Sequence, residues 1–118
     1  MRFNFKGTDT MKASLELVES GVAVKAGSQA ILEPKKHFEI HGASYATRRR
    51  ELIESGGVAN SRWLYAFAQD QFFSSASAAA SIVAGQNQNA DHWVNETGIN
   101  LGDLLRKVRS SPLSVTES

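Results

Sequence analysis

The strongest constraint on the fold is a run of alternating apolar and polar side chains that is interrupted once by a turn. The alternation runs through residues 13–18 and resumes at 22–26, and Glu19-Ser20-Gly21 lies between the two runs. A period of two is the spacing of a half-buried strand, and a turn between two such strands predicts an antiparallel hairpin. Residues 2–5 also alternate, so the sequence predicts that strands open the fold.

Helix signals begin after Gly42. The first helix is expected at about 44–55, starting at Ala43 or Ser44 and closed by Gly56-Gly57. An alanine-rich helix over 76–83 is expected next, capped by Ser74 or Ser75 and stopped by Gly85. A last helix should start at Asn100, because leucines recur at the spacing of one helix face from Leu101 onward.

The remaining segments complete the predicted architecture. Residues 58–67 resemble a second, aromatic-rich hairpin, 30–32 are expected to extend the sheet, 70–73 to link onward, and 92–94 to form a brief strand. The predicted fold class is α+β, with a small antiparallel sheet of hairpins packed by about three helices. We expect one domain over 1–109 and a flexible C-terminal tail over 110–118.

Composition limits the classes of protein. A chain of 118 residues with 42% apolar and 21% charged side chains is expected to form a single globular domain. The absence of cysteine excludes disulfides, thiolate metal sites and a cysteine nucleophile. With no apolar run long enough to cross a bilayer, and no signal-type N-terminus, we expect a cytoplasmic protein without membrane contact.

One segment contains metal-ligand residue types. His37, Glu39 and His41 would share one face if residues 36–40 were extended, and they could then bind a metal. The alternative is the wet face of an amphipathic strand with Phe38 and Ile40 turned inward. No fourth ligand lies nearby in the sequence, so we expect no metal site and no cofactor.

Catalytic residue types also occur without a catalytic pattern. Ser74, Ser75, Ser77, Asp91 and His92 supply a nucleophile, a base and a carboxylate, but no Gly-x-Ser-x-Gly elbow or phosphate-binding loop is present. A helix cap and a polar helix face explain the serines more simply. We expect no enzymatic activity.

Positive charge is clustered although the formal net charge is only +1. No Lys or Arg occurs between Trp63 and Asn100. The first cationic group consists of Lys35, Lys36, Arg48, Arg49, Arg50 and Arg62, and the second of Arg106, Lys107 and Arg109. If the groups meet, they form a phosphate-binding patch that Trp63, Tyr45 or Phe38 could supplement by stacking. The alternative is a set of solvated helix faces, with Arg50 paired to Glu54.

Three segments and several single residues resemble a known bacterial family. The segments are 22–30 (VAVKAGSQA), 49–56 (RRELIESG) and 72–80 (FFSSASAAA), followed by Val83-Ala84-Gly85, Asn89, Trp93, Gly98 and Leu101. They resemble a bacterial domain of unknown function found at the C-terminus of GIY-YIG nuclease-like proteins, which is similar to the restriction-enzyme-and-adenine-methylase-associated domain. The likeness covers about 13–106. Ala76 replaces a usual proline, and residues 89–93 (NADHW) replace a usual Asn-Gly before tryptophan.

The resemblance implies an accessory module in a DNA-processing or restriction context, and nuclease activity is not carried over from it. We therefore expect a binding module for DNA or for a DNA-acting protein. The expected contact residues are Lys35, Lys36, Arg48, Arg49, Arg50, Arg62, Asn89 and Trp93, with the loop 86–93 providing selectivity. The alternative is a protein-interaction or oligomerisation module that docks a partner through 63–67 or the 78–83 helix face. The sequence does not define the oligomeric state.

Overall fold

The computed structural model describes residues 2–6, 11–36 and 38–110. Within these residues the strands are β1 (Arg2–Phe5), β2 (Ser14–Val18), β3 (Gly21–Val24), β4 (Gln29–Ile31), β5 (Val58–Ser61), β6 (Leu64–Phe67), β7 (Gln71–Phe73) and β8 (Trp93–Val94). The helices are α1 (Phe38–His41), α2 (Ala43–Ser55), α3 (Ala76–Ala84) and α4 (Leu101–Ser110), with a 3-10 turn, η1 (Ala90–His92). The predicted α+β class, with an antiparallel sheet packed by helices, is confirmed.

The larger sheet has five strands in the order β7-β3-β2-β1-β8, and every neighbouring pair is antiparallel. The predicted hairpin forms its centre, with Val18 paired to Gly21 across the turn. Phe3, Leu15 and Val24 are fully buried on one face of this sheet. The alternate residues, which include Arg2 and Asn4, lie on the opposite, open face.

A second sheet of three strands has the order β4-β6-β5. The expectation that residues 30–32 extend the first sheet was therefore wrong, because the chain turns away at Gly27. This residue has a φ of 85°, a left-handed conformation that glycine adopts without steric cost. The backbone N–H of Gly27 donates to Phe67 of β6 at 2.9 Å, and this bond joins the two sheets.

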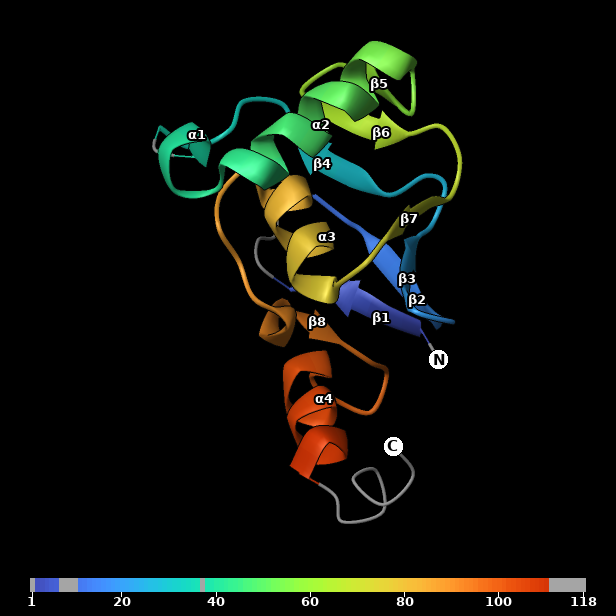
Figure 1. The fold of residues 1–118 in the computed structure, drawn as a ribbon. Coiled ribbons are helices and arrows are strands. Elements are labelled where there is room, and N and C mark those ends of the chain that lie inside the picture. Colours follow the sequence, from blue (N-terminus) through green and yellow to red (C-terminus); the bar gives the residue numbers. More distant parts are fainter. Residues whose placement is uncertain (1, 7–10, 37, 111–118) are drawn as a thin grey trace.

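Helix α3 lies at the centre of the molecule and contacts β3, β4, β7 and α2 (Figure 1). Its cap is Ser75, whose hydroxyl accepts the N–H of Ala78 at 3.0 Å, and Gly85 ends it in the left-handed conformation as predicted. Most of its small side chains, including Ala79 and Ala80, are buried. Small residues on all sides let both sheets and α2 approach one short helix closely.

Helix α4 lies at the end of the molecule opposite α1 and α2 (Figure 1). Asn100 caps it as predicted, because its side-chain oxygen accepts the N–H of Asp103 at 2.7 Å. No helix of the described segments is both long and apolar enough to cross a membrane.

Two local predictions were wrong. Residues 38–41 form a helical turn instead of a strand, so Phe38 is buried while Ile40 is 71% exposed, although the strand interpretation turned both inward. Residues 71–73, expected as a link, form the edge strand β7, in which Phe73 pairs with Val22. Pairing with a distant strand overrode a weak local pattern in the second case.

Candidate functional site

Arg49, expected as a phosphate contact, is buried and holds the fold together. Its Nη2 donates to the carbonyl oxygens of Ile31 and Leu32, the latter at 3.3 Å, and its guanidinium lies 5.3 Å from the ring centre of Tyr65. Burial lowers the pKa of Arg49 below the ordinary arginine value. Arg49 therefore clamps α2 onto the end of β4. This structural role replaces the predicted role of Arg49 as a phosphate contact.

Trp93 and Asn89, the predicted selectivity residues, also have structural roles. Trp93 is 0% exposed, and its indole N–H donates to the carbonyl of Ala76 at 3.0 Å. Asn89 is exposed, but its side-chain oxygen caps η1 by accepting the N–H of Asp91 at 3.0 Å. A fully buried indole has no surface for a ligand, so Trp93 is removed from the expected interface.

The other arginines of α2 point in different directions. Arg48 is half-buried, with its guanidinium 5.3 Å from the ring centre of Phe73 and its Nη2 donating to the carbonyl of Phe72 at 3.4 Å. Arg50 is exposed and donates to the Thr47 hydroxyl at 3.3 Å. The run 48–50 is therefore not one cationic face.

The two cationic groups of the sequence do not meet. Arg106 pairs with Asp103 and with Asp91, the latter at 3.0 Å, and α4 lies at the far end from α1 and α2 (Figure 1). The Asp103 and Asp91 carboxylates raise the pKa of Arg106. Its charge is compensated within the fold.

Lys35, Lys36 and Arg62 do lie at one end of the three-stranded sheet. Arg62 and Trp63 form the turn between β5 and β6, and Leu64 just after this turn pairs with Ile31, the last residue of β4. The chain continues from β4 directly into the segment that contains both lysines. All three cations are exposed, and Trp63 is 83% exposed.

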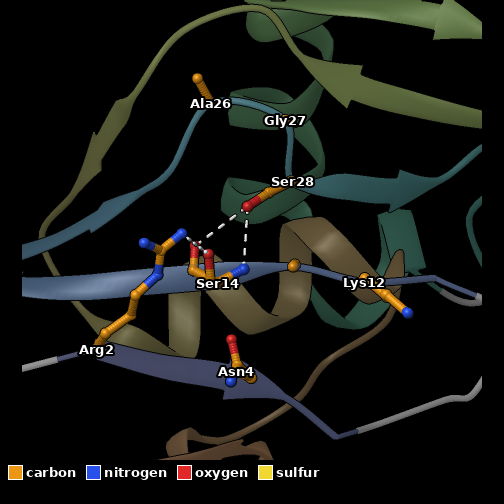
Figure 2. A pocket seen from close by; sticks show the side chains of 8 residues that line it. Arg2, Asn4, Lys12, Ser14, Ala26, Gly27 and Ser28 are labelled. Atoms are coloured by element: carbon orange, nitrogen blue, oxygen red, sulfur yellow. Dashed lines mark hydrogen bonds between the residues drawn. The ribbon is translucent and has the colours of Figure 1, made fainter.

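A separate polar groove opens where the two sheets join, and we call it the junction groove (Figure 2). It consists of two adjoining pockets of about 230 and 310 Å³ that share Asn4, Lys12 and Ala13. Its full lining among the described residues is Arg2, Asn4, Phe5, Lys6, Lys12, Ala13, Ser14, Ala26, Gly27 and Ser28. Three of these side chains are cationic, and none is a carboxylate.

Hydrogen bonds hold the wall of the junction groove in place. The buried Ser28 hydroxyl accepts the N–H of Ser14 at 3.0 Å and donates to the Ser14 carbonyl at 3.2 Å. The Ser14 hydroxyl in turn accepts from Nη2 of Arg2 at 2.9 Å (Figure 2). The guanidinium therefore lies beside Ser14, while the Lys12 side chain is directed away from Ser14 and Ser28 (Figure 2).

Two nearby carboxylates share one lysine partner. Nζ of Lys25 lies 2.8 Å from Asp70 and 3.2 Å from Glu16. Lys25 and the N–H of Ala26 hold the pKa of the Asp70 carboxyl below its usual value, and the two carboxylates raise the pKa of Lys25. Arg2, Lys6 and Lys12 place three positive charges along the junction groove, and Arg2 also interacts with the Asp70 carboxylate.

The candidate metal and catalytic groups do not form a centre in the described part of the chain. No group of three His, Asp or Glu residues there could hold a metal ion. His37 lies outside the described residues, and the helical backbone at 38–41 removes the alternation that the metal interpretation required. Two of the candidate catalytic residues have structural roles: Ser75 caps α3, and Asp91 pairs with Arg106.

A family model for a domain of unknown function, DUF4357, matches residues 3–105 of the chain. The chain belongs to this family. No curated protein and no solved structure matches it. The family match spans both sheets, α2, α3 and the start of α4, so it covers the β5–β6 turn and all of the junction groove except Arg2.

Sequence reasoning missed the junction groove because its cations come from separate segments. Arg2 is the first residue of β1, Lys6 follows that strand and Lys12 precedes β2, so they form no run in the sequence. The only local signal was the break at Gly27-Ser28, which was noted as a strand interruption and not as the wall of a pocket.

Proposed function

We propose that this DUF4357 domain is a non-catalytic accessory module that binds nucleic acid through the phosphate backbone, in a DNA-processing or restriction context. The observation that supports this proposal best is the junction groove, which has three cations, the Ser14 hydroxyl and no carboxylate among its described lining residues. Such a lining matches phosphate oxygens, which accept hydrogen bonds from Arg, Lys and Ser. The resemblance to nuclease-associated domains supports DNA as the nucleic acid.

Salt dependence tests this function directly. A short fluorescently labelled DNA is titrated with the full chain between about 50 and 200 mM salt, and binding is followed by anisotropy. We expect affinity to fall steeply with salt. Arg2→Gln and Lys12→Gln should each weaken binding and reduce the slope of log K against log salt by about 1.

Arg50→Gln is the matched control, because it removes the same charge from an exposed position on α2. It should leave the salt slope unchanged. Absence of binding at about 50 mM salt would refute the proposed function. If Arg50→Gln loses DNA binding while Arg2→Gln and Lys12→Gln retain it, the DNA interface lies on α2 and not in the junction groove.

One observation favours the second candidate, a protein-interaction module. An apolar pocket of about 370 Å³ lies between the β2–β3 turn, the start of α3 and α4, and Leu17, Val18 and Leu105 are among its lining residues. Val18 is 42% exposed there. The helix face 78–83 suggested by the sequence is unsuitable, since Ala79, Ile82 and Val83 already pack in the core. Partner binding that does not respond to salt and is lost in Val18→Glu would favour this candidate.

A further inference from the structure

The β5–β6 turn presents a tryptophan that the fold does not use. Trp63 is 83% exposed, whereas the only other tryptophan, Trp93, is 0% exposed. Of the three aromatic residues considered for stacking, Phe38 is buried and Tyr45 is half-buried, so only Trp63 presents most of its ring to solvent. A large aromatic side chain at a hairpin tip adds little to the core, and its faces are free to stack.

Arg62 has a backbone conformation that is unusual for arginine. Ser61 pairs with Leu64, so Arg62 and Trp63 form a two-residue loop, and Arg62 has a φ of 58°. Two-residue hairpin loops favour Gly, Asn or Asp because these residues tolerate positive φ. Arginine there costs conformational free energy, and such local strain is typical of positions kept for a ligand.

The surroundings of Trp63 are cationic. Arg62 is its neighbour in the turn, and Lys35 and Lys36 follow β4 at the same end of the sheet. Glu33 is the only carboxylate in the segment 32–36, so positive charge predominates. Beneath this surface Arg49 bonds the carbonyls of Ile31 and Leu32 and fixes the end of β4. An aromatic ring beside cations is the arrangement by which proteins stack unpaired bases and hold their phosphates.

We infer that the β5–β6 turn is a base-stacking site and that the preferred ligand is single-stranded nucleic acid, with the indole of Trp63 against an unpaired base. This inference rests on the proposed function. In a duplex the faces of the bases are covered by their neighbours, so an indole reaches them only after costly unstacking. β4 leads from the junction groove at Ser28 to Ile31, which pairs with Leu64 next to the turn, a distance of about 10 Å at 3.3 Å per residue.

Intrinsic fluorescence provides the test, because Trp63 is the exposed fluorophore and Trp93 is shielded. Oligothymidylate and a duplex of equal length are titrated into the full chain at low salt, and a labelled oligonucleotide measures affinity by anisotropy. We expect oligothymidylate to quench the red-shifted emission of Trp63, with little change from the duplex. Trp63→Ala should bind oligothymidylate about 5- to 100-fold more weakly.

Two variants serve as controls. Trp63→Phe retains a ring, so it should lose the quenching but bind better than Trp63→Ala. Ile40→Ala removes another exposed hydrophobic side chain, 71% exposed on α1, and should bind within about twofold of wild type. Far-ultraviolet circular dichroism checks that each variant is folded.

The outcomes separate this inference from the proposed function. Salt-sensitive binding with unchanged Trp63 emission and an unaffected Trp63→Ala affinity would refute stacking but leave the proposed function intact. Equal quenching by the duplex would refute the preference for single strands. No binding of either oligonucleotide at low salt would refute both.

Discussion

Replacement of Arg49 by alanine tests whether this residue belongs to the scaffold or to a ligand site. The side chain is 6% exposed, donates to two backbone carbonyls and lies over the ring of Tyr65. Alanine removes all three interactions and leaves a gap between α2 and the end of β4. The expected result is a large loss of stability.

The magnitude follows from the separate contributions. Hydrogen bonds from a charged donor contribute about 1.5–3 kcal/mol each when well formed, and a desolvated cation–π contact about 2 kcal/mol. The desolvation of the guanidinium, which also lowers the pKa of Arg49, opposes these gains. We expect a net loss of about 3 kcal/mol from Arg49→Ala. At about 4 °C per kcal/mol for a domain of this size, the Tm should fall by about 12 °C.

Urea unfolding followed by circular dichroism and by Trp93 emission measures this loss. Arg50→Ala is the matched control, because this neighbouring arginine is exposed, and it should change stability by less than about 0.5 kcal/mol. A loss below about 1 kcal/mol in Arg49→Ala would refute the clamp. If Arg49→Ala instead keeps full stability but no longer binds DNA, Arg49 is a phosphate contact, as the sequence predicts.

Four further changes have defined expectations. Ser75→Ala removes the α3 cap and should cost about 1 kcal/mol in urea unfolding, whereas Ser74→Ala should cost less than about 0.5. Trp93→Phe loses buried ring atoms and the bond to the Ala76 carbonyl, so it should cost about 3 kcal/mol by the same measurement. Arg62→Gly should stabilise the turn by about 1 kcal/mol, as judged by Tm, because glycine relieves the left-handed strain. The pKa of Asp70 is lowered from 3.8 in the folded state, so the ionised carboxylate stabilises the fold above that pH. This contribution to the free energy of unfolding is lost as the pH falls through the lower folded-state pKa. Asp70→Asn should therefore flatten the acidic part of a curve of stability against pH.

Local signals in the sequence were sufficient for most of the individual elements. The turn at 19–21, the serine cap of α3 and the asparagine cap of α4 each depend on residues within a few positions of one another, and the structure confirms all three. Element pairing was not encoded so locally. The division into two sheets follows from the pairing of β4 with β6, a strand that is distant from it in the sequence.

The same distinction applies to the candidate site. The sequence identified exposed cations correctly at Lys35, Lys36 and Arg62 but could not show that they share one end of the second sheet. It also could not assemble the junction groove, whose wall at Ser28 is bonded to Ser14 across the sheet junction. Pairing across the fold placed these groups together.

The three consecutive arginines of α2 show why a charge run is a poor guide to a binding face. Successive residues of an α-helix point about 100° apart, so three neighbours cannot all face one ligand. Here Arg48 lies over Phe73, Arg49 clamps β4, and only Arg50 is exposed. Side chains of different elements can supply a cationic surface that this run does not. The junction groove is built in this way, and for this reason we place the phosphate contacts of the domain there and not on α2.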